Sequence, residues 1–159
     1  MKKLRIYLDT SVINFLFADD SPDFRKATED FFMNNAKHHE LAISSVVLAE
    51  IEADPDEAHR NLLKGVIKRY AISRLPDDHL DSIEILANAY LDKGAIPPSK
   101  YEDGLHVAYA TVNSMDILFS WNFKHLANVR KEERFLAINM EMGYSHPMRI
   151  VSPMEAIYG

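Results

Sequence analysis

The sequence predicts an α/β fold in which a central, mostly parallel sheet is covered by helices on both faces. Short apolar segments with strand character alternate with helical segments of roughly 10 to 16 residues, which is the pattern of βαβ units. The first of these segments is almost continuously apolar, as a buried parallel strand is. The chain has 159 residues, a usual length for one core, so we expect residues 1–159 to form a single domain.

The first half of the chain is predicted to contain three strands and four helices. Pro22 suits the first turn of a long helix, and Ser44 or Ser45 can cap a later helix by accepting hydrogen bonds from its free N–H groups. In order, we expect a strand at residues 4–8, a short helix at 11–18, a helix from 22 to 37–39, a strand at 41–43, helices at 46–53 and 57–69, and a strand at 70–72.

The second half is predicted to alternate in the same way. Gly94 ends one helix, and Ser99 with Glu102 forms a capping-box pattern at the start of the next. In order, we expect helices at residues 79–92 and 99–114, a strand at 117–120, an interrupted helical stretch at 125–142, and a last strand at 149–151.

Composition excludes several classes of protein. Without cysteine, the chain forms neither disulfides nor thiolate-bound zinc sites, which agrees with a cytoplasmic location. No segment approaches the roughly 20 apolar residues of a membrane span, and Asp9 interrupts the apolar run near the N-terminus, so we expect neither a membrane anchor nor a signal peptide. The net charge of −6 argues against a protein that coats nucleic acid, but not against a metal-dependent nuclease.

Three acidic residues are expected at one edge of the sheet. Asp9 follows the first strand, and right-handed crossovers bring Glu50 and Asp103, near helix starts, to the same edge. Three close carboxylates repel one another, so they need a cation or a shared proton. Simpler explanations exist for two of them, because Asp9 can cap the next helix and Asp103 lies where a helix dipole favours negative charge. Helical spacing separates Glu50 from Glu52 by roughly 200°, so at most one faces this edge, and periodicity does not choose between them.

Four segments in the right order resemble the signature segments of the PIN-domain family, and the resemblance extends over nearly the whole chain. They are LDTS at residues 8–11, SSVVLAEI at 44–51, DGLHVAYA at 103–110, and DILFSWNFKH at 116–125, which matches a subgroup reading S-W-N-x-K-H. The resemblance implies a PIN-like three-layer α/β/α sandwich and a metal-dependent ribonuclease, often the toxin of a VapC-type toxin–antitoxin pair. It therefore implies an RNA substrate, a cognate antitoxin and a homodimer.

The resemblance also assigns the site and selects Glu50 over Glu52. It implies that Asp9, Glu50 and Asp103 bind Mg²⁺ or Mn²⁺, directly or through water, with catalytic help from Asn122. Many PIN domains carry a fourth acid where this chain has Asn122, which adds no charge. The three carboxylates suffice for one well-bound, hydrated Mg²⁺.

The neighbours of these residues are candidates for contacting the substrate phosphate. They are Thr10, Ser11, Ser120, Lys124 and His125. For Thr10 and Ser11, capping the next helix is an equally good explanation. Trp121 is expected to pack in the protein rather than stack on a base, and His106 is expected to be structural.

Two other functions are alternatives to the ribonuclease. A phosphatase of the haloacid-dehalogenase type would use Asp9 as nucleophile but needs a second Asp two residues on, where this chain has Ser11. The alternative from another class is a non-catalytic PIN-like module that binds RNA or protein. For the expected homodimer, early apolar residues offer an interface or, alternatively, core packing: Ile13, Phe15, Leu16, Phe17, Phe24, Phe31 and Phe32.

Overall fold

A five-stranded parallel sheet forms the centre of the protein in the computed structural model, which describes residues 2–157. The strands are β1 (Arg5–Leu8), β2 (Glu40–Ile43), β3 (Ser73–Arg74), β4 (Ile117–Phe119) and β5 (Arg149–Val151). Their order is β3-β2-β1-β4-β5, and every neighbouring pair is parallel. The predicted α/β fold with a mostly parallel sheet is therefore confirmed.

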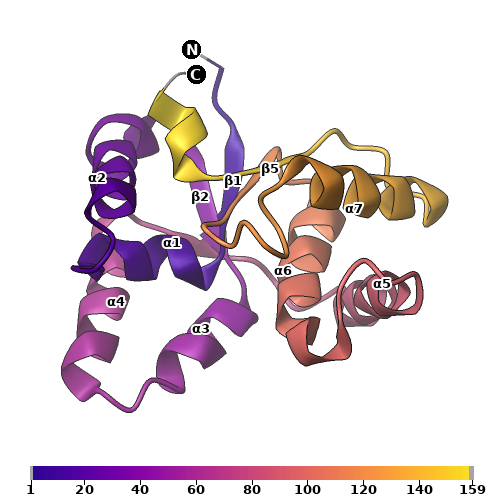
Figure 1. The fold of residues 1–159 in the computed structure, drawn as a ribbon, viewed down its shortest axis with the longest axis horizontal. Helices are drawn as coiled ribbons and strands as arrows, with labels where there is room; N and C mark the ends of the chain where they lie inside the picture. Colours follow the sequence, from indigo (N-terminus) through magenta and orange to yellow (C-terminus); the bar gives the residue numbers. More distant parts are fainter. Residues whose placement is uncertain (1, 158–159) are drawn as a thin grey trace.

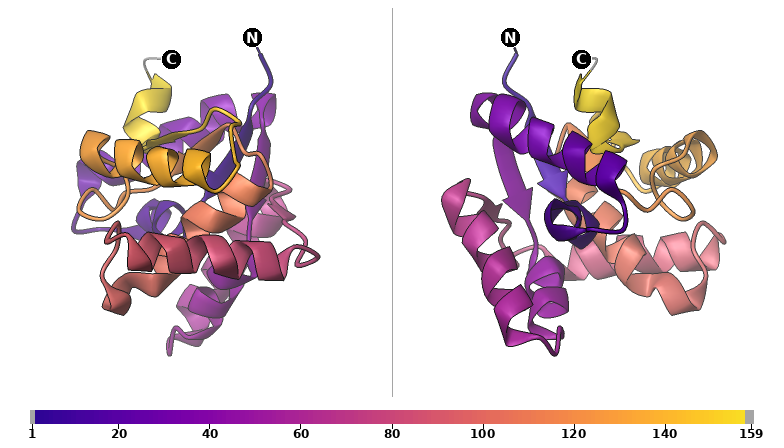
Figure 2. Two further views of the ribbon diagram at one scale, coloured as in Figure 1. Left: turned by 90° about the vertical axis from the view of Figure 1, so that its right-hand side faces the viewer. Right: turned by 60° about the vertical axis from the view of Figure 1, so that its left-hand side comes forward.

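Helices flank this sheet on two sides, as Figure 1 and the turned views in Figure 2 show. The α-helices are α1 (Thr10–Asn14), α2 (Pro22–Asp30), α3 (Ser45–Glu52), α4 (Glu57–Arg69), α5 (Leu80–Asp92), α6 (Tyr101–Val112) and α7 (Val129–Glu141). Helices α1 to α4 lie to one side of the strands in Figure 1, and α5 to α7 lie to the other. This is the layered arrangement of an α/β/α sandwich.

The position of β1 at the centre of the sheet explains its apolar sequence. Ile6, Tyr7 and Leu8 are all buried, because β2 pairs with one side of β1 and β4 with the other. The chain moves from β1 to β2 on one side and later returns to β4 on the other, so the end of β1 is a topological switch point. In open parallel sheets, ligands bind outside the carboxyl ends of the strands at such a point.

Three details differ from the sequence prediction. The third strand is Ser73–Arg74 rather than residues 70–72, because Tyr70 ends α4 and Ala71 takes a positive φ of 50°. The expected Ser99 cap does not form, since α6 starts at Tyr101 after a 3₁₀ turn and has no side-chain cap. The helix that begins at Pro22 changes to a π turn over Phe31–Asn35 and a 3₁₀ turn over Ala36–His38.

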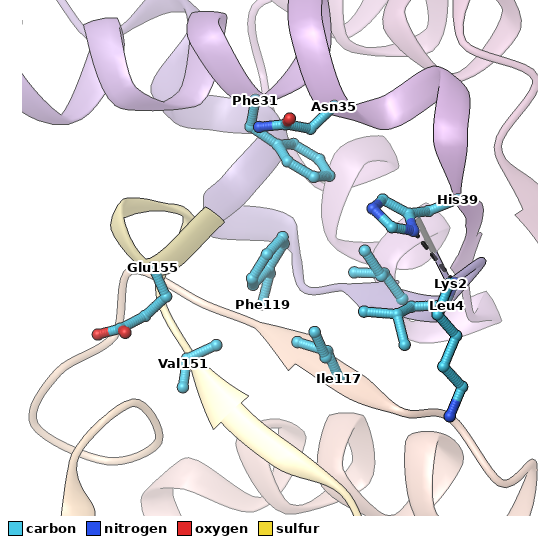
Figure 3. A pocket seen from close by; sticks show the side chains of 10 residues that line it. Lys2, Leu4, Phe31, Asn35, His39, Ile117, Phe119, Val151 and Glu155 are labelled. Atoms are coloured by element: carbon cyan, nitrogen blue, oxygen red, sulfur yellow. Dashed lines mark hydrogen bonds between the residues drawn. The ribbon is translucent and has the colours of Figure 1, made fainter. Parts of the chain in front are cut away.

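An apolar cavity of about 310 Å³ lies between the sheet and the helical segment that follows α2. Figure 3 shows Phe31 above the cavity, Phe119, Ile117 and Val151 along its sheet side, and Lys2 at one end. It is lined by none of the three predicted acids. Within the described residues, no helix is long and apolar enough to cross a membrane.

Candidate functional site

Asp9 lies directly after β1, at the switch point of the sheet, and is only 4% exposed. Its side chain is the N-cap of α1, where it accepts a hydrogen bond from the Val12 N–H at 3.3 Å. The Ser11 hydroxyl donates to the same carboxylate oxygen at 2.5 Å. The capping explanation is therefore correct for Asp9, but a cap does not require such burial. Burial raises the pKa of this carboxyl, while a charge on His106 and hydrogen bonds from Ser11 and Ser120 lower it.

Glu50 faces the same region from α3, and Glu52 does not. The Glu50 carboxylate contacts His106, with 2.7 Å between Oε1 and Nε2. Glu52 forms an ion pair with Lys64 on α4. Both glutamates are exposed, so only the direction of the side chain separates them. The structure thus supplies the distinction that helical periodicity left open.

Asp103 lies in the first turn of α6 and meets the residues that follow β4. Asn122 donates from Nδ2 to Asp103 Oδ2 at 3.2 Å, and the Asn122 side-chain oxygen accepts the His125 N–H at 3.0 Å. The Asp103 side chain is half-buried. Burial raises its pKa, the positive charges of His106, His125 and Lys100 lower it, and the negative charge of Glu50 raises it. The net pKa of Asp103 is raised.

His106 contacts the candidate site, although the sequence predicts only a structural role for it. It lies one turn after Asp103 on α6 and is 2% exposed. Its Nε2 contacts Glu50, and its Nδ1 lies 2.6 Å from the Tyr7 hydroxyl, which lies 2.7 Å from Ser44 Oγ. The available signal was its spacing of three residues from Asp103, which places both side chains on one helical face.

His106 couples the three acids electrostatically. Burial lowers the pKa of its imidazole, but the hydrogen bond to Glu50 and the charges of Asp9, Glu50 and Asp103 raise it, and the net pKa is raised. The pKa values of Asp9 and Asp103 are both raised. The main cause in each is burial rather than repulsion between the carboxylates.

The five residues predicted to contact the substrate differ in their hydrogen bonds and in their burial. Ser11 and Ser120 bond to Asp9 and also accept backbone N–H groups of Trp121 and Asn122, respectively. Thr10 is buried, Lys124 is exposed and His125 is half-buried. Among the described residues, the buried side-chain polar atoms without a hydrogen-bond partner are Thr10 Oγ1 and His125 Nδ1. Both atoms belong to predicted site residues.

Trp121 packs in the protein, as predicted. Its ring stacks on Phe24 with 4.5 Å between centroids, and its Nε1–H donates to Thr28 at 2.9 Å. The early apolar residues proposed for a dimer interface pack similarly. Ile13, Phe31 and Phe32 are core residues, and the other four are partly buried against the core. Core packing, the alternative explanation, therefore accounts for Ile13, Phe31 and Phe32.

The donor set suits a hydrated divalent cation better than an ion enclosed by protein. Within residues 2–157, no three His, Asp or Glu side chains converge closely enough to hold an ion together. Mg²⁺ needs only one or two carboxylates, because it retains several waters. Asp9, Glu50, Asp103 and Asn122 offer the hard oxygen ligands that Mg²⁺ prefers. The unpartnered atoms of Thr10 and His125 lie on residues adjoining this set, since Thr10 follows Asp9 and His125 bonds to Asn122.

Solved structures with a similar fold include three complexes. VapBC from Salmonella typhimurium, bound to DNA, matches with a TM-score of 0.59 and 18% identity over 94% of this chain and 98% of that chain. FitAcB from Neisseria gonorrhoeae matches with a TM-score of 0.57 and 15% identity over 93% and 97%. VapBC2 from Rickettsia felis, bound to a promoter DNA fragment, matches with a TM-score of 0.58 and 22% identity over 76% and 90%. At these identities the likeness is one of fold. No family model matches the sequence, and no curated protein matches it.

Proposed function

We propose that this protein is a PIN-like, VapC-like ribonuclease that hydrolyses RNA phosphodiesters with the help of Mg²⁺ or Mn²⁺. The observation that carries the proposal is that three acids from distant segments all act on one buried histidine, His106, beside the switch point of the sheet. Asp9 is buried there, Glu50 contacts His106, and the charges of all three acids act on His106. Clustered acids at a ligand crevice are characteristic of sites that bind a cation and a phosphate.

In this proposal, Asp9, Glu50 and Asp103 hold the cation, directly or through water. The cation would supply Lewis-acid polarisation of a phosphoryl oxygen and lower the pKa of a bound water. Asn122 keeps Asp103 in place through its Nδ2 donor. The exposed ammonium of Lys124 and the half-buried imidazole of His125 lie next to Asn122 in the chain and would bind the substrate phosphate.

We further propose that the protein is the toxin of a toxin–antitoxin pair and acts in the cytoplasm. The fold likeness to VapBC and FitAB-type complexes supports this context. A group of acids without a cation is a favourable place for a basic side chain of a protein partner. A homodimer remains part of the proposal, and the partly buried Phe15, Leu16, Phe17 and Phe24 are its candidate interface residues.

The direct test is cleavage of RNA oligonucleotides by the purified protein with Mg²⁺ or Mn²⁺ and then with EDTA. We expect cleavage that EDTA abolishes and that Asp9→Asn reduces by about 10²-fold or more, because metal assistance contributes several kcal/mol. Asp20→Asn, which changes an exposed aspartate, is the matched control and should retain activity. Cleavage that survives EDTA would refute the metal-dependent mechanism. RNA binding without cleavage would instead favour a non-catalytic PIN-like module.

A further inference from the structure

A buried chain of hydrogen bonds connects the three elements that carry the acids. Tyr7 lies in β1 two residues before Asp9, Ser44 caps α3, which carries Glu50, and His106 lies on α6 one turn after Asp103. The Tyr7, Ser44 and His106 side chains are buried, with exposed fractions of 0%, 0% and 2%. A buried polar network of this kind is stable only when every member is satisfied.

The direction of each hydrogen bond follows from the groups at its two ends. The Val46 N–H donates to Ser44 Oγ at 3.2 Å, so the Ser44 hydroxyl is free to donate to Tyr7. Tyr7 then donates its own proton to His106 Nδ1, and His106 Nε2–H donates to the Glu50 carboxylate, which can only accept. Every donor and acceptor along this path is used once.

The opposite direction leaves a group unsatisfied. If His106 Nδ1 donated to Tyr7, the Tyr7 hydroxyl would donate to Ser44. Ser44 Oγ would then accept hydrogen bonds from both Tyr7 and Val46. The Ser44 hydroxyl proton would have no acceptor among these groups. A buried donor without a partner is costly. The packing around Tyr7 and Ser44 therefore favours the tautomer in which Nε2 of His106 carries the proton.

We infer that His106 is a positioning residue, held by Tyr7 and Ser44, which fixes the orientation of the Glu50 carboxylate at the acidic site. Glu50 needs such support, because it is otherwise exposed on α3. His106 binds one carboxylate oxygen, Oε1, and this contact restricts the orientation of the whole carboxylate. Partners that orient a metal-binding carboxylate in this way change metal affinity or activity by about 10- to 100-fold. This inference rests on the proposed function for its consequence, but not for its geometry.

The geometry is tested without metal or RNA. The ¹⁵N resonances of the His106 ring, assigned with His106→Gln and recorded above the pKa of this residue, report which nitrogen carries the proton. We expect the proton on Nε2, and we expect Tyr7→Phe to reduce the population of this tautomer, because Nδ1 loses its donor. A wild-type ring protonated on Nδ1 would overturn the inference.

The consequence is tested by Mn²⁺ binding, followed by electron paramagnetic resonance, with a matched pair of tyrosines. Tyr7 and Tyr90 are both fully buried, and Tyr90 donates to Asn139 between α5 and α7. Each Tyr→Phe change removes one buried hydroxyl and should lower the melting temperature similarly. We expect only Tyr7→Phe to weaken Mn²⁺ binding, by about 10-fold.

His106 variants separate positioning from general damage. His106→Leu removes the donor to Glu50 and should weaken Mn²⁺ binding by about 10- to 100-fold. His106→Gln retains an N–H donor and should recover part of the loss. Equal Mn²⁺ affinity in Tyr7→Phe and Tyr90→Phe would contradict the positioning role. A wild-type protein that neither binds Mn²⁺ nor cleaves RNA would instead reject the proposed function, and the His106 tautomer would still decide the hydrogen-bond chain.

Discussion

Asn122 donates a hydrogen bond to Asp103, with 3.2 Å between Nδ2 and Oδ2, at the position where many PIN domains carry a fourth acid. The amide therefore partly compensates a carboxylate whose pKa burial raises. A second carboxylate at this position would repel Asp103 in the absence of a cation and attract a cation more strongly.

We predict that Asn122→Asp lowers the free energy of unfolding by about 1–3 kcal/mol in EDTA, because a donor is replaced by a like charge. Adding Mn²⁺ should reverse much of this loss. The new carboxylate should also make Mn²⁺ binding tighter than in the wild type. Thermal unfolding with and without Mn²⁺ measures both effects. Asn113→Asp is the control, since Asn113 donates to the Tyr109 carbonyl rather than to an acid. A variant Asn122→Asp that Mn²⁺ does not stabilise would count against a cation at Asp103.

The two glutamates of α3 provide a second comparison. Glu50→Gln should reduce RNA cleavage by about 10²-fold or more, because the amide lacks the charge that holds the cation. Glu52→Gln should leave cleavage unchanged, because it alters only an exposed ion pair with Lys64. Initial cleavage rates of the two variants at equal protein concentration decide the question. Equal loss in both variants, or loss only in Glu52→Gln, would show that the wrong glutamate was assigned.

The sequence was sufficient to predict the order of the elements and the position of Asp9 at the carboxyl end of the first strand. Strand β1 and helix α4 are clear from periodicity and from their flanking Asp and Pro residues. The shift of the third strand and the missing Ser99 cap were not predictable, because tertiary contacts outweigh weak local preferences there. The contact between His106 and Glu50 joins residues far apart in the chain. Only the packing of α3 against α6 reveals it, so nothing in the sequence distinguishes His106 from a structural histidine.

Replacing Asp9 or Asp116 by Asn should change the free energy of unfolding in opposite directions. Burial raises the pKa of Asp9, so the folded protein holds a proton at this position more tightly than the unfolded chain. The protonated Asp9 carboxyl thus contributes its full stability at a pH below its pKa in the unfolded chain. This contribution is lost as the pH rises through its pKa in the folded protein. In EDTA near neutral pH, Asp9→Asn should raise the free energy of unfolding by on the order of 1 kcal/mol, because Asn caps a helix without the charge. The difference should disappear near pH 3–4.

Asp116 is the counterpart at the opposite edge of the sheet. Burial raises the pKa of its carboxyl, but hydrogen bonds from the Arg5 N–H at 2.8 Å and from His146 at 2.9 Å lower the pKa by more. The pKa of Asp116 is therefore below its usual value. Its contribution is present above the unfolded pKa and lost as the pH falls through the folded pKa. Asp116→Asn should therefore lower the free energy of unfolding at neutral pH by about 1 kcal/mol. Chemical denaturation at several pH values measures both variants, and changes of the same sign in both would contradict this assignment.

If the protein is a toxin, its antitoxin should insert a basic side chain among the acids in place of the cation. A guanidinium can bind carboxylates in a bidentate manner, and Asp9 and Asp103 are both withdrawn from full solvent contact, which strengthens such a pair. The net charge of −6 would also accelerate association with a basic segment, and that rate should fall with added salt.

Co-expression with the neighbouring gene product, followed by affinity purification, tests this partner. We expect a complex whose dissociation constant rises by about 10²-fold or more in the double variant Asp9→Ala with Asp103→Ala, because the basic group then loses both charges. The control pair Asp19→Ala with Asp20→Ala removes two exposed acids and the same net charge, so it should change only the salt-dependent association rate. Equal binding by both double variants would show that the partner does not use the acids. The absence of any partner would remove the antitoxin from the proposal and leave the nuclease to be decided by the cleavage assay.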